Sequence, residues 1–553
     1  MKKLLLFIAT FVILFTGCDD FAENTVVCVQ LDPLEKVFTE ESYFVENDET
    51  AAVAKGETAT FQFVVRSAYP IQNLKIDAGN LVSGDRQIAA TLKAFVGYIR
   101  AGKHAGDRKN SAVHRSKDAV FPVSDYYPDC LKDIETVDVQ PMQNQPIWVS
   151  YAVPRDAMDG DYTATIVFTG KINGKQIKFT KEVNAKVYPV ALPEQSLWVT
   201  NWWFSNGFAK MNGDQPVEMY SDRWWELLGE IAHVTRDHRQ NVYMVGGPNV
   251  YLDGKQFSFD FTTFDKTVEF LIREGGLKRI EGHHLAGRPR GDFGWKDDFH
   301  VSVPYVGYRP LSNDTTQNYL SQYLSALYSH LEAKGWTSMY MQHIADEPID
   351  ENAASYSRIA DFVKKFMPGI PLVDAVMSHK LANTVNIWVP VLDQYHKEYP
   401  FYQERQAAGD EIWFYTCVVP QDNYANRFLE QPLSHTRFLH WINFRYGSTG
   451  YLHWGLNFWD LDKTNDASSY GETWAGGEAW IVYPTEGRVF SSIRLAAMRD
   501  GIADYELLKL LEQKAPDKSK ELAANVIKDF DNYNSNVRAF RLTRLELLEA
   551  LCE

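Results

Sequence analysis

Two adjacent carboxylates, Asp346 and Glu347, have the residue types and spacing best suited to chemistry in this chain. They follow the apolar-leaning segment 339–345 and precede Pro348. Because proline cannot continue the hydrogen-bond ladder of a sheet, the pattern predicts a strand whose carboxyl end carries both acids. In an α/β barrel this end of a strand faces the active site. Two acids placed there could protonate a leaving group and stabilise a cationic intermediate.

Cleavage of a glycosidic bond is the reaction that this pair suits. One carboxylic acid must protonate the departing oxygen while a second group stabilises an oxocarbenium-like centre. That second group is either a carboxylate on another strand or, in substrate-assisted catalysis, the 2-acetamido oxygen of the sugar. Adjacent Asp346 and Glu347 fit the substrate-assisted mode if the backbone turns near Asp346, since strand neighbours point to opposite faces. The alternative interpretation of the pair is an acidic surface turn.

Aromatic and polar residues that could bind a sugar recur at other predicted strand ends. Aromatic rings stack on the C–H faces of sugars, and Asn, Asp and His side chains bind hydroxyl groups. Packing in the barrel core is the alternative role for each of them. The candidates are Asn201, Trp202, Trp413, Tyr415, Trp454, Trp459 and Asp460.

Two further candidates are the doublet His283-His284 and Tyr395. We interpret one histidine of the doublet as a sugar-hydroxyl contact, with core packing and metal binding as alternatives. Neighbouring residues diverge and no carboxylate lies at a helical spacing beside them, so no metal site is predicted. Either Tyr395 or Tyr415 could donate its hydroxyl to an acetamido oxygen. The chain contains no GxSxG elbow, HExxH helix or Walker loop.

The elements that must position these residues begin near residue 193. Strand-like and helix-like segments alternate from there to about residue 490, which is typical of a parallel sheet. Eight strands, each followed by a crossover, predict an α/β fold in the form of a (β/α)8 TIM-like barrel over 193–490. The predicted strands are Leu197–Phe204, Asn241–Val245, Arg279–His284, Ser338–Ala345, Pro371–Met377, Asn386–Leu392, Glu411–Val418 and Gly450–Trp459.

The barrel is expected to have a neighbour on each side in the sequence. Residues 19–192 contain β-branched and aromatic segments separated by turn signals, and Asn173-Gly174 is a strong hairpin signal. We expect a β-sandwich there. Residues 491–553 predict three helices, 492–501, 504–513 and 518–551, that pack on the outside of the barrel.

Length and charge limit the class of protein. A chain of 553 residues is expected to form two or three domains. The formal net charge of −16 argues against a nucleic-acid partner, because no basic surface is available to displace phosphate counterions.

Residues 1–18 predict a lipoprotein signal peptide. Lys2 and Lys3 precede an apolar run that is shorter than the ~20 residues of a transmembrane helix. The small residues before Cys18 resemble a bacterial lipoprotein cleavage site, although Phe15 stands where leucine is usual. We therefore expect an exported protein, periplasmic or on the cell surface, whose lipidated Cys18 anchors it to the outer membrane. Simple secretion is the alternative.

The triplet Asp346-Glu-Pro348 resembles glycoside hydrolase family 123, the exported bacterial β-N-acetylgalactosaminidases. The segments 477–484 and 492–506 resemble a broader group that includes this family. The resemblance implies a β-sandwich followed by a (β/α)8 barrel, no cofactor, and a retaining, substrate-assisted mechanism. Carried over by position, Asp346 would orient and stabilise the acetamido group, and Glu347 would be the general acid/base.

The expected function is thus an exo-acting hydrolase that releases terminal β-linked N-acetylgalactosamine (GalNAc) through an oxazolinium intermediate. Its partner would be an oligosaccharide or a glycolipid head group. A conventional retaining β-glycosidase with a separate carboxylate nucleophile and a non-catalytic glycan-capture lipoprotein are the alternatives. The sequence does not choose between GalNAc and N-acetylglucosamine (GlcNAc), and it does not indicate an oligomeric state.

Overall fold

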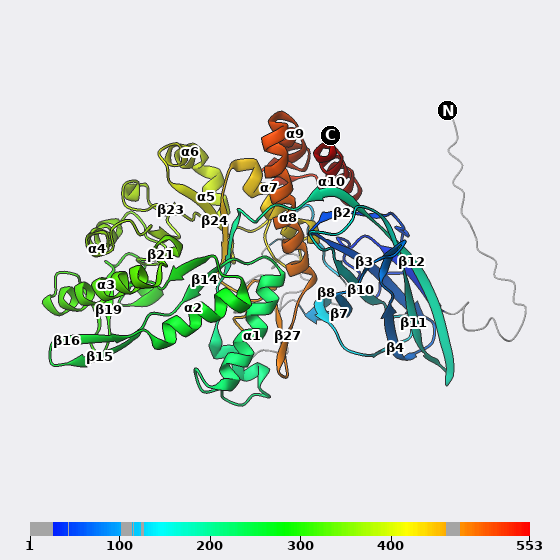
Figure 1. The fold of residues 1–553 in the computed structure, drawn as a ribbon, viewed down its shortest axis with the longest axis horizontal. Coiled ribbons are helices and arrows are strands. Elements are labelled where there is room, and N and C mark those ends of the chain that lie inside the picture. Colours follow the sequence, from blue (N-terminus) through cyan, green and yellow to red (C-terminus); the bar gives the residue numbers. More distant parts are fainter. Residues whose placement is uncertain (1–25, 43, 101–112, 114, 123–125, 460–475) are drawn as a thin grey trace, which may run out of the picture.

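The computed structural model describes residues 26–42, 44–100, 113, 115–122, 126–459 and 476–553. Two parts of the chain lie side by side in Figure 1: a strand-only part in blue and cyan, and a part in green and yellow where strands and helices alternate. The helices of the C-terminal tail lie between them. Of the predicted features, the signal peptide with Cys18 and the candidate Asp460 lie outside the described residues.

Two mostly antiparallel sheets form the strand-only part, which we call the double-sheet unit. Their strand orders are β1-β3-β10-β7-β8 and β2-β12-β11-β4-β9, with β5 paired to β11 and β6 paired to β5. The strands are β1 (Val26–Leu31), β2 (Ala51–Lys55), β3 (Thr58–Ser67), β4 (Ile71–Ala78), β5 (Leu81–Ser83), β6 (Arg86–Ile88), β7 (Leu92–Arg100), β8 (Tyr126–Lys132), β9 (Val137–Val139), β10 (Gln145–Ala152), β11 (Gly160–Ile172) and β12 (Lys175–Ala191).

The two sheets pack on each other through apolar side chains. Phe63 of β3 meets Phe168 of β11 with ring centroids 5.4 Å apart, and buried residues of both sheets form one cluster. The hairpin between β11 and β12 turns at Asn173 and Gly174, whose φ angles are 51° and 77°. A two-residue turn with both φ angles positive matches strand twist, which confirms the predicted hairpin.

Eight parallel strands follow, one at each predicted position. They belong to two half-barrel sheets with strand orders β13-β25-β24-β23-β22 and β14-β17-β21. The strands are β13 (Trp198–Asn201), β14 (Val242–Val245), β17 (Arg279–Gly282), β21 (Tyr340–Gln342), β22 (Val373–Asp374), β23 (Ile387–Trp388), β24 (Glu411–Tyr415) and β25 (Gly450–His453). Each is shorter than its predicted segment, because residues after the strand bend away into loops.

The two half-barrel sheets meet at two seams that have isolated hydrogen bonds instead of a regular ladder. At one seam, the side-chain oxygen of Asn241 accepts from the backbone N–H of Val199 at 2.9 Å. At the other, Gln342 donates its backbone N–H to the carbonyl oxygen of Pro371 at 3.0 Å. The predicted mixed α/β fold is confirmed, but the described strands form two half-barrel sheets rather than one continuous ladder.

Helices follow most of these strands and cover the sheets from outside (Figure 1). Local signals explain their ends: Ser221 caps α1 by accepting from the backbone N–H of Trp224, and left-handed Gly335 ends α3. The helices are α1 (Asp222–Asp237), α2 (Thr262–Gly275), α3 (Asp314–Lys334), α4 (Ala353–Phe366), α5 (Leu392–Lys397), α6 (Tyr399–Ala407) and α7 (Leu433–Tyr446), with short 3-10 turns η2 (Ser205–Met211), η3 (Gly291–Gly294), η4 (Thr337–Met339) and η5 (His379–Leu381).

Short hairpins extend the loops between these elements. Two of them, β15–β16 and β18–β20, follow β14 and β17 and therefore lie at the carboxyl ends of the parallel strands. Their strands are β15 (Asn249–Asp253), β16 (Gln256–Asp260), β18 (Ala286–Gly287), β19 (His300–Val303) and β20 (Gly307–Arg309), and a third hairpin, β26 (Tyr483–Thr485) with β27 (Arg488–Phe490), precedes α8.

The tail folds differently from its prediction in two respects. One helix, α8 (Ile493–Lys514), replaces the two predicted over 492–513, since Gly501 does not interrupt it. A Cβ atom at Gly501 would lie 2.4 Å from the backbone oxygen of Arg437, so glycine allows α8 to pack closely on α7. The predicted third helix is broken into α9 (Pro516–Val526) and α10 (Val537–Cys552) by the hairpin β28 (Ile527–Asp529) with β29 (Asn532–Tyr533).

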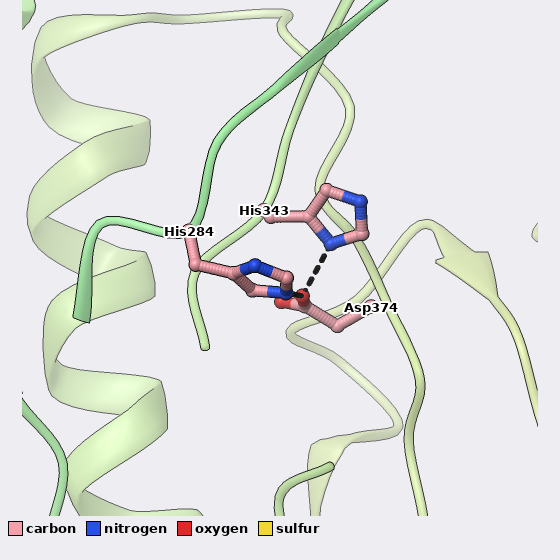
Figure 2. Close-up of side chains that lie close together, drawn as sticks. All are labelled: His284, His343 and Asp374. Atoms are coloured by element: carbon pink, nitrogen blue, oxygen red, sulfur yellow. Dashed lines mark hydrogen bonds and ion pairs between the residues drawn. The ribbon is translucent and has the colours of Figure 1, made fainter. Parts of the chain in front are cut away.

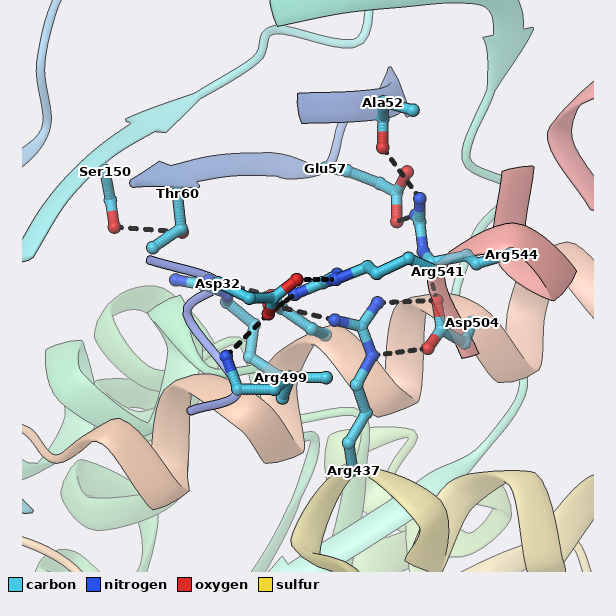
Figure 3. A network of polar contacts seen from close by, with 12 residues as sticks. Asp32, Ala52, Glu57, Thr60, Ser150, Arg437, Arg499, Asp504, Arg541 and Arg544 are labelled. Carbon is cyan, nitrogen blue, oxygen red and sulfur yellow. Dashed lines mark hydrogen bonds and ion pairs between the residues drawn. The ribbon is translucent and has the colours of Figure 1, made fainter. Parts of the chain in front are cut away.

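Buried ion pairs join the tail to the double-sheet unit, and we call this group the interdomain network (Figure 3). Asp504 of α8 accepts from Arg437 Nε at 2.7 Å and from Arg544 Nε at 2.8 Å. Arg544 of α10 also pairs with Glu57, and Arg541 forms two 2.8 Å bonds to Asp32. The planar guanidinium groups match the carboxylates, so these pairs fix the orientation of the side chains and also balance their charges. Its members are Asp32, Glu57, Arg437, Asp504, Arg541 and Arg544.

Two further findings concern export. Within the described ranges, no helix combines the length and apolar character that crossing a bilayer requires. The cysteines at 28, 130, 417 and 552 are free thiols.

Candidate active site

The predicted acid pair lies at the end of β21, in a backbone turn. His343 to Ala345 are buried, Asp346 is exposed and Glu347 is half-buried. Glu347 has a φ angle of 49°, in the left-handed region that non-glycine residues rarely adopt. The backbone therefore departs from strand geometry at the acids, as the sequence requires if both side chains serve one site. Such strain is typical of functional positions.

Tyr415 of β24 reaches the pair from the opposite half-barrel sheet. Its hydroxyl donates a hydrogen bond of 2.5 Å to Glu347 Oε1. Burial, and then the neighbouring Glu347, raise the pKa of Tyr415 well above its usual value. The hydroxyl therefore stays protonated and serves as a fixed donor to the carboxyl group.

Arg288 holds the backbone of the same turn. Its guanidinium donates to the carbonyl oxygen of Glu347 at 2.7 Å. The guanidinium also lies over the rings of Trp295 and Phe299, 4.2 Å and 5.0 Å from their centroids. A cation that is both stacked and hydrogen-bonded has little freedom, so the insertion after β17 fixes the position of Glu347.

A buried histidine lies in the segment that leads to the acid pair. His343, three residues before Asp346, has Nδ1 2.6 Å from Asp374 Oδ1 and Nε2 2.7 Å from Glu281 Oε1. Burial alone would lower the pKa of His343, but Asp374 and Glu281 raise it to about 10. We call Glu281, His343 and Asp374 the histidine network. At neutral pH it contains an imidazolium ion between two carboxylates.

The histidine network also anchors the chain that leads to the acids. Asp374 Oδ2 accepts from the backbone N–H of Ile344 at 2.9 Å and from the hydroxyl of Tyr356. Glu281 accepts from Trp202 Nε1 at 2.9 Å. The segment between β21 and Glu347 is therefore bonded on both sides, and its position depends on charges that the barrel interior encloses.

His284, His343 and Asp374 are drawn in Figure 2, and their side chains offer three potential metal-ligand atoms within 4.8 Å of one another. Two nitrogen or oxygen ligands of a tetrahedral zinc ion lie about 3.3 Å apart. His343 Nδ1 is closer than this to Asp374 Oδ1, at hydrogen-bond distance, and its other nitrogen already contacts Glu281. The geometry favours a protonated, hydrogen-bonded group over a metal centre.

Four of the predicted sugar contacts gather near the acid pair. His283 is exposed, while His284, Trp202 and Trp454 are half-buried. The ring of His284 lies 5.8 Å from that of Trp202 and 4.4 Å from that of His343. These residues keep their predicted role as candidate contacts, because part of each side chain is accessible.

Four other predicted contacts have enclosed side chains in this structure, and their polar atoms have internal partners. Their role in sugar binding stays a prediction. Asn201 bonds to Gln240 and Arg427, and Tyr395 donates to the carbonyl oxygen of Tyr446 at 2.8 Å. Trp459 donates to the carbonyl oxygen of Val482 at 2.9 Å. The residues enclosed in this way, with their exposed fractions, are Asn201 (2%), Tyr395 (1%), Trp413 (0%) and Trp459 (4%).

Tyr395 and Trp413 are buried in two different environments. Tyr395 packs between Phe414 and Phe530 on the outer side of the sheet, so of the two candidate tyrosines only Tyr415 lies at the acid pair. Trp413 packs inside the barrel, where a Cβ atom on Gly450 would lie 2.3 Å from its ring. Aromatic residues in a strand alternate between these two environments, and composition alone does not distinguish them.

A third carboxyl group near the acids was not predicted. Burial raises the pKa of Glu478 to about 7, although the hydrogen bond from Trp454 Nε1 opposes the shift. Glu478, Glu347 and Asp346 all act on the thiol of Cys417, whose pKa burial and these charges raise. The three carboxyl groups thus lie around one cysteine at the end of β24.

Sequence reasoning also missed Glu281, His343, Asp374 and Arg288. The first three are charged or titratable residues inside predicted apolar strands, which is itself a signal of a buried network. Arg288 has no comparable signal, because its role depends on a loop that folds back over the turn.

Family models identify the chain. The model described as "Glycoside hydrolase 123 N-terminal domain" matches residues 39–170, and "Glycoside hydrolase 123, catalytic domain" matches residues 249–511. The chain belongs to glycoside hydrolase family 123. The resemblance carried by Asp346-Glu-Pro348 is confirmed, and the acid pair lies within the catalytic match of this family 123 glycoside hydrolase.

Solved structures agree on the fold of the family 123 chain. A family 123 glycoside hydrolase from Clostridium perfringens has a TM-score of 0.72 at 15% identity and covers 96% of this chain and 97% of its own. A Bacteroidetes-affiliated GH5 cellulase is 9% identical and covers 56% and 92%, with a TM-score of 0.35. An endo-β-1,4-mannanase from Thermotoga petrophila is 11% identical and covers 56% and 77%, also with a TM-score of 0.35. The last two are too distant to carry an argument. A search of curated proteins found no match.

Proposed function

We propose that this family 123 glycoside hydrolase is an exo-acting, retaining β-N-acetylgalactosaminidase that uses substrate-assisted catalysis. The observation that carries the proposal is the turn at Asp346-Glu347, where Tyr415 binds Glu347 and the backbone takes a left-handed conformation. Two neighbouring carboxyl groups, one held by a hydroxyl donor and the other exposed, suit two different tasks on one sugar.

In the first step, Glu347 donates its proton to the glycosidic oxygen. The bond between C1 and that oxygen breaks while the acetamido carbonyl oxygen forms a new bond to C1. Asp346 accepts the amide N–H and stabilises the positive charge of the oxazolinium ring. The aglycone leaves as an alcohol. Tyr415 keeps Glu347 oriented for this transfer and is a positioning residue in the proposed mechanism.

In the second step, Glu347 is a carboxylate and acts as the general base. It takes a proton from water, whose oxygen attacks C1 as the oxazolinium ring opens. The amide is restored, and the sugar leaves with its original β configuration. Both displacements invert C1, so the overall result is retention.

A glycan of a glycolipid is one proposed substrate class. The Clostridium perfringens structure is described in connection with glycolipid glycan hydrolysis, and that description concerns the other enzyme. It supports testing glycolipid head groups and the corresponding free oligosaccharides on this chain.

Substitution of the two acids tests the assignment of roles. Glu347→Gln should lower kcat/KM on a substrate with a poor leaving group by about 10²–10⁴-fold, because protonation of that group is lost. An activated aryl glycoside should lose less, whereas Asp346→Asn should impair both substrates. Equal losses on both substrates for Glu347→Gln would contradict its role as the acid.

Small-molecule probes test the chemistry. The enzyme should hydrolyse 4-nitrophenyl β-GalNAc faster than the β-GlcNAc analogue, with β-anomer released first by NMR, and a thiazoline analogue of GalNAc should inhibit it. Covalent labelling of a carboxylate by a fluorosugar would instead establish the conventional retaining mechanism, for which Glu478 is a nearby carboxyl group. Saturable sugar binding without turnover of either aryl glycoside would indicate a glycan-capture protein.

We also propose finer features of the fold and the location of the enzyme. The two half-barrel sheets would act as one (β/α)8 barrel, and the double-sheet unit as a β-sandwich domain. Cys18 would carry the lipid that anchors the exported enzyme to the outer membrane. Fatty-acid labelling of the wild-type chain but not of Cys18→Ala would support the anchor, and equal labelling would reject it.

A further inference from the structure

Exposed aromatic rings concentrate on two neighbouring insertions beside the acid pair. They are carried by β15–β16 and by the segment from β18 to β20. The exposed fractions are 53% for Tyr251, 96% for Phe293, 37% for Trp295, 71% for Tyr305 and 44% for Tyr308. We call these five residues the aromatic platform. Other strongly exposed aromatic side chains in the described ranges are Tyr69, Tyr126 and Tyr220, which lie elsewhere on the molecule.

Direct contacts join the two insertions to each other and to the acid pair. The hydroxyl of Tyr305 donates to the carbonyl oxygen of Val250 in β15 at 2.6 Å. Arg288 lies under Trp295 and donates to the carbonyl oxygen of Glu347. Both insertions follow strands of the half-barrel sheet that contains β21: the second follows β17, which pairs with β21, and the first follows β14, on the other side of β17. They therefore lie at the end of the sheet that carries the acids.

Tyr305 combines an unfavourable backbone conformation with an exposed ring. Its φ angle is 67°, in the left-handed region that bulky residues rarely adopt. The side-chain hydroxyl of Tyr305 is tethered to Val250, yet most of the residue is exposed to solvent. Exposed rings contribute little to folding, so this arrangement points to a ligand.

We propose that the aromatic platform binds the aglycone, the saccharide units on the leaving-group side of an extended glycan. This inference rests on the proposed glycosidase function and adds the region that selects the rest of the substrate. Aromatic rings stack on C–H faces of sugars, and the ion pair between Arg290 and Asp297, which flank Phe293 in the sequence, offers partners for hydroxyl groups.

A membrane surface is the competing occupant, and the composition of the insertions argues against it. A membrane-binding face needs a continuous apolar surface with surrounding lysine and arginine. Leu252 is the one strongly exposed aliphatic side chain among the described residues of both insertions. Rings without an accompanying aliphatic surface suit successive sugar units better than a bilayer.

The test compares two substrates in one variant. The double variant Phe293→Ala/Tyr251→Ala removes one ring from each insertion, both outside the turn that carries the acids. Its kcat/KM is measured on an aryl β-GalNAc and on a soluble GalNAc-terminated tetrasaccharide. We expect the ratio of tetrasaccharide to aryl activity to fall about tenfold, mainly through KM, as a stacking contact of about 1.4 kcal/mol requires. Tyr69→Ala, a matched exposed aromatic in the double-sheet unit, should leave the ratio unchanged.

Three other outcomes would overturn the proposal. An unchanged ratio, or equal losses on both substrates, would show that the rings do not bind the aglycone. A loss confined to the same head group embedded in phosphatidylcholine vesicles would assign the platform to the lipid surface. If the wild type hydrolyses neither substrate, the proposed function fails first. Calorimetric binding of the tetrasaccharide to Glu347→Gln, with and without the two ring substitutions, then decides the platform separately: about tenfold weaker binding supports it, and equal or absent binding rejects it.

Discussion

The histidine network and the interdomain network are both buried groups of opposite charges, but they differ in the cation. Arginines supply the positive charge between the tail and the double-sheet unit, and an imidazolium supplies it beneath the acid pair. Burial would raise the pKa of Asp504, yet Arg437 and Arg544 lower it to about 2. Because arginine does not lose its proton in proteins, the interdomain network keeps its charges across the working pH range. The histidine network keeps its cation only while His343 is protonated.

This difference separates a structural role from a functional one. The interdomain network connects α7, α8, α10 and the double-sheet unit, and it contacts no residue of the acid turn. The histidine network bonds directly to the segment that carries Asp346 and Glu347. Breaking the first should therefore change stability, and breaking the second should change activity.

The largest effect is expected from Arg544→Met. Glu57 would lose its buried arginine partner and Asp504 would lose one of its two arginines, and breaking a buried pair costs about 3–5 kcal/mol. Chemical denaturation should show this loss in the free energy of unfolding, while kcat/KM of the folded fraction stays within about twofold. Arg538→Met, an exposed residue of the same helix, is the control. A catalytic defect without destabilisation would show that the interdomain network, like the histidine network, supports activity.

Asp374→Asn should produce the reverse pattern. The amide keeps the shape of the side chain, but it removes the charge that holds the His343 proton and weakens the bond to Ile344. A displacement of the acids by about 1 Å can cost about 10²-fold in rate, so we expect a loss of that order in kcat. Asp361→Asn, at an exposed site of α4, should have no effect. Full activity in Asp374→Asn would show that the network does not position the acids.

Tyr415→Phe tests the direct contact to the acid pair. Loss of one hydrogen bond to a carboxyl group corresponds to about 1.5 kcal/mol, or roughly tenfold in kcat/KM. Tyr395→Phe is the matched control, because it removes a hydroxyl that bonds to the backbone of Tyr446. It should lower stability slightly and leave kcat/KM unchanged. The opposite ranking of the two variants would restore Tyr395 as the active-site tyrosine.

The pH dependence of stability is expected to be the most gradual effect, because it is spread over several pH units. Below about pH 6.5 His343 is protonated in both the folded and the unfolded chain, so its contribution is fully present. Between pH 6.5 and about 10 the unfolded chain binds fewer protons, so the free energy of unfolding falls, by up to about 1.4 kcal/mol per pH unit. Urea titrations at several pH values should show this slope in the wild type and a smaller one in His343→Gln. Identical slopes would contradict a buried imidazolium ion at His343.

Much of the fold was predictable because local patterns are strong in it. Alternating apolar segments located all eight parallel strands, and Asn173-Gly174 located a hairpin. The tail was harder to predict, because tertiary packing rather than local helix propensity decides the structure at Gly501 and after Val526. A glycine suggests the end of a helix, but here it permits close contact between α7 and α8.

The site was predictable only where chemistry and position coincide in the sequence. Asp346 and Glu347 stand next to each other before a proline, so their place at a strand end follows from neighbouring residues. Trp413 and Trp202 have the same residue type, yet one is enclosed in the barrel and the other lies half-exposed over His284.

The sequence by itself determined the order of the eight parallel strands, the acid pair and the family. Only the tertiary structure decided that Tyr415 rather than Tyr395 serves the acids, that His343 is held between two carboxylates, and that Arg288 holds the turn. The physical reason is distance along the chain. Hydrophobic period and turn chemistry act over a few residues, whereas Glu347 and Tyr415 are 68 positions apart, and their contact exists only once the sheets have formed.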